Sequence, residues 1–173
     1  MSGSAPRTRV IAPLVFAVAF ASPAPAFAAS LRAPRVDPQL GSATVFHVAR
    51  AAARLGRPGC AAVLEDFTGV ETGRPLSSRL VTSGVSPREF LSRLTYRKAP
   101  PRGPCARSDV LAYTSPGSLV IWVCADTFEE IEARDDALAS SILIHETLHS
   151  LGLGENPPTS AEITERVRER CGW

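Results

Sequence analysis

The sequence predicts a single small α+β domain, and three observations lead to this fold class. The chain has 173 residues, which is enough for one domain and too few for two. Several segments place capping residues beside apolar residues at helical spacing. Two runs rich in β-branched and aromatic residues, at 109–114 and 118–124, flank a Ser-Pro-Gly turn and therefore predict a β-hairpin. Helices and strands grouped in this way predict an α+β domain with a mixed or antiparallel sheet.

The first 28 residues have the three parts of a secretory signal peptide. Arg7 and Arg9 come first, an apolar run follows at 10–21, and a small-residue cleavage pattern ends at Ala28. The apolar run has only about 12 residues, whereas a membrane-spanning helix needs about 20. We therefore expect cleavage near Ala28 and an exported protein, secreted or periplasmic, that is not held in a membrane.

The elements of the rest of the chain are predicted in the following order. They are a loose lead-in at 29–41, a helix at 42–56, a strand at 60–67, a helix at 86–94, the hairpin at 109–124, a long helix at 135–153 and a short C-terminal helix at 159–171. Residues 42–173 then form the single domain.

The helix boundaries follow from capping residues. Ser42 can cap the first helix and Gly56 can end it. Ser86 caps the second helix, and Glu89 is placed to close a capping box. The acidic pair at 135–136 suits the positive end of the long helix, because acids stabilise a helix N-terminus.

The charge balance argues against a nucleic-acid-binding surface. The chain has 19 basic and 17 acidic residues, and the excess is accounted for by Arg7 and Arg9 of the predicted leader. Since no basic stripe is left after the leader, we expect neither nucleic acid nor an anionic membrane as a partner.

Four cysteines follow the leader, at Cys60, Cys105, Cys124 and Cys171. An even number of cysteines in an exported chain predicts two disulfides, although three pairings are equally compatible with the sequence. No two of them have C-x-x-C spacing, which disfavours a zinc site made of thiolates.

The long helix contains the stretch HETLH. His145 and His149 are four residues apart, so they stack on one helix face and can offer ring nitrogens to one metal ion. Glu146 points to the side of that ion, where it can reach a water molecule. Metal-assisted hydrolysis needs this arrangement, because the metal makes water acidic and the carboxylate accepts its proton.

The alternative is an ordinary buried helix that carries two histidines. Leu143, Ile144 and Leu148 indicate that the helix is buried nearly all round. Two stacked histidines are costly there unless something satisfies their nitrogens, and a metal ion does so. We therefore favour metal binding. The third histidine, His47, is expected at the surface or half-buried in the helix at 42–56.

HETLHSLGLGE resembles the zinc-binding signature of metzincin-type zinc metallopeptidases, H-E-x-x-H-x-x-G-x-x-H. Four residues match it, namely His145, Glu146, His149 and Gly152. The resemblance implies a zincin-like domain, Zn²⁺ as cofactor, Glu146 as general base and a peptide or protein substrate. It extends over about a dozen residues, and the family's methionine turn has no counterpart because Met1 is the only methionine.

The third metal ligand differs from the signature. Glu155 stands in place of the third histidine, as an acidic residue does in some small exported zincins. It precedes Asn156 and two prolines, whose stiff backbone can hold a ligand in place. The alternative is Glu162, because gluzincins take a glutamate from a second helix, but Thr159 and Glu162 also form a capping box. We expect Glu155 to be the ligand.

The substrate is expected to bind beside the long helix. In zincins an edge strand next to this helix binds extended peptide, and the strand at 118–124 is expected to act in this way by β-augmentation. Trp122 is expected in the core, with the cleft as its alternative, and Tyr113 is a weaker candidate for an oxyanion donor.

The sequence therefore predicts an exported, disulfide-stabilised zinc metallopeptidase that hydrolyses peptide bonds. Two alternatives stay open. One is a zinc hydrolase of another amide or ester, because the motif specifies activation of water and not the acyl group. The other is a non-enzymatic exported binding module with a structural metal or none.

Overall fold

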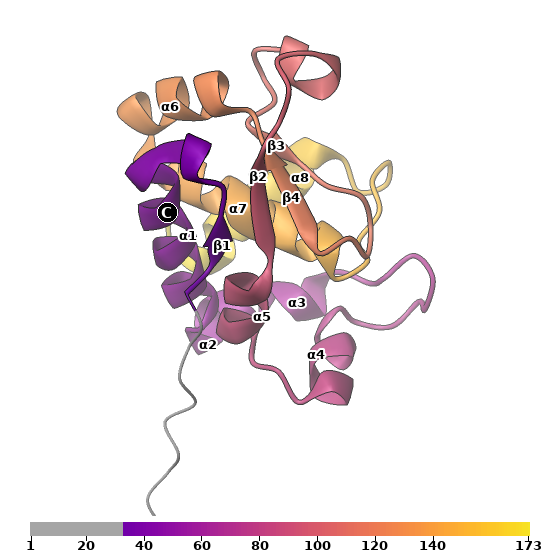
Figure 1. Ribbon diagram of the computed structural model, residues 1–173. Coiled ribbons are helices and arrows are strands. Elements are labelled where there is room, and N and C mark those ends of the chain that lie inside the picture. Colours follow the sequence, from indigo (N-terminus) through magenta and orange to yellow (C-terminus); the bar gives the residue numbers. More distant parts are fainter. Residues whose placement is uncertain (1–32) are drawn as a thin grey trace, which may run out of the picture. The chain divides into compact units, whose positions relative to one another are not determined.

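A four-stranded mixed sheet and the helices packed against it form the α+β fold that the sequence predicts (Figure 1). The computed structural model describes residues 33–173, so the predicted leader at 1–28 lies outside the described residues. The elements are β1 (Arg35–Val36), η1 (Pro38–Leu40), α1 (Gly41–Leu55), α2 (Pro58–Ala61), α3 (Val63–Asp66), α4 (Ser77–Ser83), α5 (Pro87–Arg93), β2 (Thr95–Lys98), η2 (Gly103–Ala106), β3 (Ala112–Tyr113), β4 (Val120–Val123), α6 (Ala125–Arg134), α7 (Asp136–Ser150) and α8 (Ser160–Cys171).

The sheet has the strand order β1-β2-β4-β3. β1 pairs with β2 and β2 with β4 in parallel, whereas β3 pairs with β4 in antiparallel register, with Ala112 opposite Val123. Ile121 and Val123 point into the core with Tyr96 of β2. β4 is therefore an inner strand, and the two edge strands are β1 and β3, of which β3 contacts α7. The expectation that residues 118–124 form the edge is wrong, because β2 covers the other side of β4.

α7 lies at the centre of the domain, with α1, α6, α8 and β3 packed around it. Asp135 caps the helix, since its carboxylate accepts a hydrogen bond from the Leu138 N–H at 2.8 Å. Leu143, Ile144 and Leu148 are fully buried, and each contributes about 1.5–3 kcal/mol to stability by leaving water. Packing on several sides therefore holds the half of α7 that carries the two histidines.

The hairpin, the long helix and the terminal helix are confirmed near their predicted positions. The helix predicted at 42–56 is also present, but it begins at Gly41 after Leu40, so Ser42 is not its cap. Ser86 caps α5 as expected through the Glu89 N–H. The Glu89 carboxylate binds Arg93 instead of closing the capping box.

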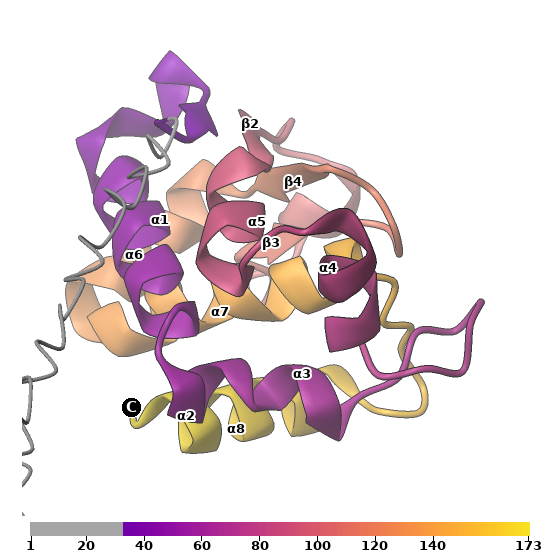
Figure 2. The same cartoon turned by 90° about the horizontal axis from the view of Figure 1, so that it is seen from below.

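Residues 60–66 are mostly helical, so the strand predicted at 60–67 is wrong. α2 and α3 replace it, and they lie alongside α8 in Figure 2. Cys60, Val63 and Leu64 are the buried positions, with spacing of three and four residues that is typical of a helix. A short apolar run does not distinguish a buried strand from a buried helix, which explains the error.

The described part of the lead-in is ordered, contrary to the expectation for 29–41. Arg35 and Val36 form β1, and the Asp37 N–H donates to the Tyr96 carbonyl at 2.9 Å. β2, α4 and α6 were also not predicted. β1 has only two residues and therefore no measurable period. β2 lies between the helix predicted at 86–94 and the hairpin, in a segment for which no element was predicted.

Two disulfides are present, and their pairing answers the question that the sequence left open. Cys60 is bonded to Cys171, which joins α2 to α8, and Cys105 is bonded to Cys124, which joins η2 to the start of α6. Such bonds are consistent with an extracellular protein. Of the helices that the structure describes, none combines the length and the apolar character that a bilayer crossing requires.

We expect the two disulfides to contribute unequally to stability. The Cys60–Cys171 bond spans 111 residues and the Cys105–Cys124 bond spans 19. Loop-closure entropy therefore predicts a loss of about 5 kcal/mol when the first pair is replaced by serine, and about 3 kcal/mol for the second. Urea denaturation of the two double variants measures the difference, and a larger loss for the shorter loop would contradict this ranking.

Candidate metal centre

Three potential metal ligands converge at the C-terminal end of α7. His145 Nε2 and His149 Nε2 lie 2.9 Å apart. Glu155 Oε1 lies 3.6 Å from the first nitrogen and 3.3 Å from the second. All three ligand atoms lie within 4.8 Å of one another. Ligands of one tetrahedral zinc ion at about 2.1 Å are separated by about 3.4 Å, so the three atoms fit a single ion.

The backbone after α7 brings Glu155 back to the histidines. The Gly152 N–H donates to the His149 carbonyl at 2.7 Å, and Gly152 has a φ of 104°, which L side chains rarely adopt. The chain can therefore leave the helix axis within one residue. The Gly152 carbonyl in turn accepts a hydrogen bond from the Val70 N–H at 3.0 Å, which anchors this turn to the neighbouring loop.

Both imidazole rings are held by their Nδ1 atoms. His149 Nδ1 lies 2.8 Å from the Leu153 carbonyl, which can only accept, so Nδ1 carries the proton and Nε2 presents a lone pair to the cluster. His145 Nδ1 lies 2.9 Å from Thr164 Oγ1 of α8. When the Thr164 hydroxyl accepts a hydrogen bond from His145 Nδ1, the lone pairs of both Nε2 atoms and the Glu155 carboxylate face one another and repel one another. A cation relieves that repulsion, and in its absence a proton on His145 Nε2 can do so.

Burial keeps His145 neutral. Burial is the larger cause and the neighbouring His149 the smaller, and together they lower the pKa of the imidazole from 6.5 to about 3. At neutral pH no proton has to be displaced from this ring before it binds a metal ion.

Glu146 is buried beside the cluster, and one of its carboxylate oxygens forms no hydrogen bond with the described residues. Its Oε2 atom has no hydrogen-bond partner among the described residues. Burial raises the pKa of this carboxyl well above its usual range, the Glu155 carboxylate raises it further, and a hydrogen bond from the Thr114 backbone N–H opposes the increase. An unpartnered buried carboxylate is costly. A nearby cation favours the ionised form, so this residue also fits a metal centre.

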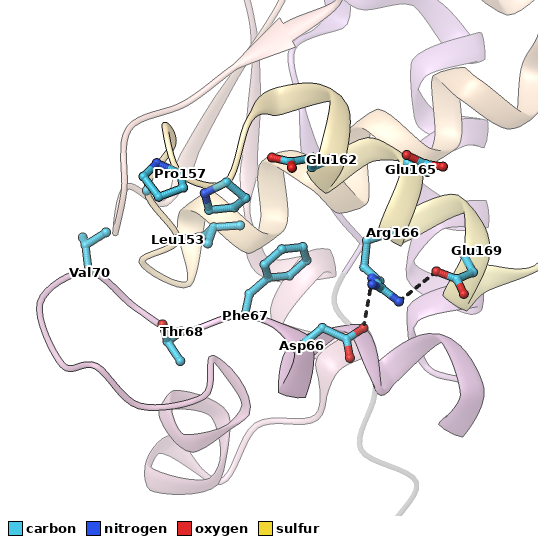
Figure 3. A pocket seen from close by; sticks show the side chains of 12 residues that line it. Asp66, Phe67, Thr68, Val70, Leu153, Pro157, Glu162, Glu165, Arg166 and Glu169 are labelled. Atoms are coloured by element: carbon cyan, nitrogen blue, oxygen red, sulfur yellow. Dashed lines mark hydrogen bonds and ion pairs between the residues drawn. The ribbon is translucent and has the colours of Figure 1, made fainter.

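Glu162, the alternative third ligand, lies elsewhere. Its Oε2 atom accepts from the Thr159 N–H at 2.7 Å and from the Thr159 hydroxyl at 2.8 Å, in the predicted capping box. Figure 3 shows Glu162 at a cavity of about 800 Å³ lined by α8, Asp66 of α3 and Pro157. α8 does contribute to the metal cluster, but through Thr164, a contact that the sequence did not reveal.

Replacement of Glu155 by alanine is expected to weaken zinc binding at least about 100-fold. Loss of an outer hydrogen-bond partner costs 10–100-fold in metal affinity, and loss of a ligand costs more. Glu162→Ala is the matched control, and we expect it to change zinc affinity less than about threefold because its carboxylate binds Thr159. Competition with a fluorescent chelator measures both. Equal effects, or the reverse order, would contradict the assignment.

The other residues considered from the sequence lie outside the cluster. His47 is buried, not at the surface, because its Nδ1 lies 2.8 Å from Ser140 Oγ and its ring packs on Phe128. Tyr113 and Trp122 are opposite each other on β3 and β4. Trp122 is half-buried and is not one of the buried residues that form the core.

Two cavities lie at the two ends of β3. One of about 600 Å³ is lined by Leu111, just before β3, and by Ile142 and Thr164. The other, of about 730 Å³, is lined by Gly117 and by Gly152 at the end of α7. β3 and the residues after it therefore run from the first cavity to the second and pass Glu146 at Thr114.

Fold and site together define an α+β domain with a His-His-Glu cluster and a buried glutamate beside it. Comparison of the chain with protein-family models, with curated proteins and with solved structures found no match. Assignment of a function therefore depends on the chemistry of these residues.

Proposed function

We propose that the protein is an exported zinc metallopeptidase. The observation that carries this proposal is the convergence of His145, His149 and Glu155 beside the unpartnered carboxylate oxygen of Glu146. Two imidazoles and one carboxylate are a common donor set of hydrolytic zinc sites, in which three protein ligands leave one position for water or substrate. The disulfides and the predicted leader support export.

Each surrounding residue has a role in this proposal. Zinc, when bound, supplies a more acidic water molecule and a polarised substrate carbonyl. Glu146 takes the proton from water and passes it to the leaving amine. The Thr114 N–H holds the Glu146 carboxylate, and Thr164 and the Leu153 carbonyl hold the imidazole rings in the orientation that directs Nε2 to the metal.

The edge strand β3 supports a peptide as the substrate. Its partner on one side is β4, and no described strand covers its other side. An extended peptide can add to such an edge through backbone hydrogen bonds. Because Thr114 follows β3 directly and its N–H reaches Glu146, a peptide on this edge lies within reach of the base.

The two alternatives have less support from the residues. A small ester or amide makes no use of a free strand edge that passes the base. A structural zinc site is usually closed by four protein ligands, whereas three ligand groups converge here. A binding module also gives no reason for burying Glu146 with an unsatisfied oxygen.

Metal removal and restoration test this function. We expect the purified protein to contain about one zinc ion per chain and to cleave unstructured proteins such as casein. Chelation should abolish cleavage, and equimolar zinc should restore it. Protein that contains no zinc and takes up none would contradict the proposal, and so would cleavage that survives complete chelation.

A further inference from the structure

The cavity on the Gly117 side of the cluster has a basic and hydroxyl-rich lining. Two arginines line it, together with four hydroxyl side chains: Arg74, Arg79, Thr72, Ser78, Thr82 and Ser83. Glu71 is the one acid among its lining residues. The cavity volume of about 730 Å³ accommodates several side chains of a bound peptide.

Neither guanidinium in this cavity is neutralised by a described residue. Arg93, Arg107 and Arg134 elsewhere in the domain form ion pairs, whereas Arg74 and Arg79 form none with residues 33–173. Arg79 Nη1 lies 3.5 Å from the Ser150 carbonyl at the end of α7, which positions one of its nitrogens. The donors that are left over match the two oxygens of a carboxylate.

The cavity adjoins the C-terminal end of α7, the helix that carries the two histidines of the proposed zinc centre. The Gly117 N–H donates to the carbonyl of His149 at 2.9 Å, and the Gly152 N–H donates to the same carbonyl. Gly117 and Gly152 both line the cavity. Gly117, which follows β3 by four residues, therefore lies both beside the end of the metal-bearing helix and at the rim of this cavity.

The direction of β3 determines which end of a peptide enters. Antiparallel pairing is the more stable and more frequent arrangement of two strands. A peptide antiparallel to β3 runs from Gly117 towards Leu111, so its N-terminal part lies at the arginines. Pro116 and Gly117, which line the cavity, come two and three residues after Thr114, in the turn between β3 and β4.

We propose that this cavity selects substrates with an acidic side chain two or three residues before the cleaved bond, and that Arg79, assisted by Arg74, binds the carboxylate. This inference rests on the proposed peptidase function. It adds a class of substrate, because the metal cluster and Glu146 do not distinguish one side chain from another.

Peptide binding to the Glu146→Gln variant tests the selection separately from cleavage. The probes are three fluorescein-labelled peptide pools, identical except for glutamate, glutamine or lysine at the second and third residues before the central bond. We expect the zinc-loaded variant to bind the glutamate pool about tenfold more tightly than the glutamine pool, and the lysine pool most weakly. This preference should decrease at high salt.

Substitutions of the arginines complete the test. Adding Arg79→Gln and Arg74→Gln to Glu146→Gln should abolish the preference for glutamate, whereas Arg79→Lys should retain part of it. Arg57→Gln is the matched control, because Arg57 is exposed and lies outside this cavity. Equal binding of the glutamate and glutamine pools, binding of no pool, or a preference that survives both substitutions would overturn the subsite. Cleavage of the pools by the unaltered enzyme, without any preference for glutamate, would overturn the subsite and leave the peptidase standing.

Discussion

Replacement of Glu146 by glutamine is expected to leave zinc in place and to reduce peptide cleavage by about 10²–10⁴-fold, the usual contribution of a general base. Glutamine has the shape of glutamate but cannot accept the proton from water. The three ligand groups are unchanged, and none of them bonds to Glu146. The Thr114 N–H can still donate to the amide oxygen, so the side chain should keep its position.

The same substitution separates the three candidate functions. A peptidase predicts that kcat falls while zinc content and KM change little, because the base acts in the transition state. A hydrolase of esters predicts the same loss on ester substrates and no peptide cleavage in the unaltered protein. A binding module predicts no loss of any activity. Glu162→Gln is the matched control, since this carboxylate caps α8, and it should leave cleavage within about twofold. Unchanged cleavage by Glu146→Gln would exclude Glu146 as the base.

The local part of the site could be predicted from the sequence because it depends on one helix. Spacing of four residues places His145 and His149 on one face of any helix, whatever packs around it. Gly152 and the prolines after Glu155 are also local signals, and the structure does bring Glu155 to the two nitrogens.

The residues that orient this site come from distant segments and could not be predicted. Thr164 reaches His145 because α8 packs across α7, and Thr114 reaches Glu146 because β3 lies beside α7. Neither contact produces a periodic pattern in the sequence. The Arg79 cavity depends on α4, a helix that the pattern did not indicate.

The sheet illustrates the same limit. The hairpin was predicted, but the strand expected at the edge is the inner one, because β2 pairs with β4 across a separation that no local pattern encodes. β1 has two residues and is held by its register with Thr95 and Tyr96. The order of the strands, and with it the strand that lies at the edge beside α7, therefore had to come from the structure.

Replacement of His149 by alanine is expected to abolish zinc binding, with a loss of affinity of at least about 10³-fold, beyond the 10–100-fold that an outer partner contributes. His149 Nε2 is one of the three ligand atoms, and its ring is fixed by the Leu153 carbonyl. Alanine also leaves that carbonyl without its partner, so the metal-free variant should lose about 1–3 kcal/mol of stability. Metal content alone is therefore not a sufficient measurement, because a variant that is unfolded would also lack zinc.

Zinc-dependent stability resolves this ambiguity. A ligand present at about 1,000 times its Kd stabilises the folded state by about 4 kcal/mol. At that zinc concentration the unaltered protein should gain this amount over its chelated form in urea denaturation, whereas folded His149→Ala should gain almost none. His145→Ala should behave in the same way, and Glu162→Ala should gain as much as the unaltered protein. A full gain in His149→Ala would mean that zinc binds elsewhere. Because a metal bound away from Glu146 gives that carboxylate no water to deprotonate, the peptidase proposal would then fail as well.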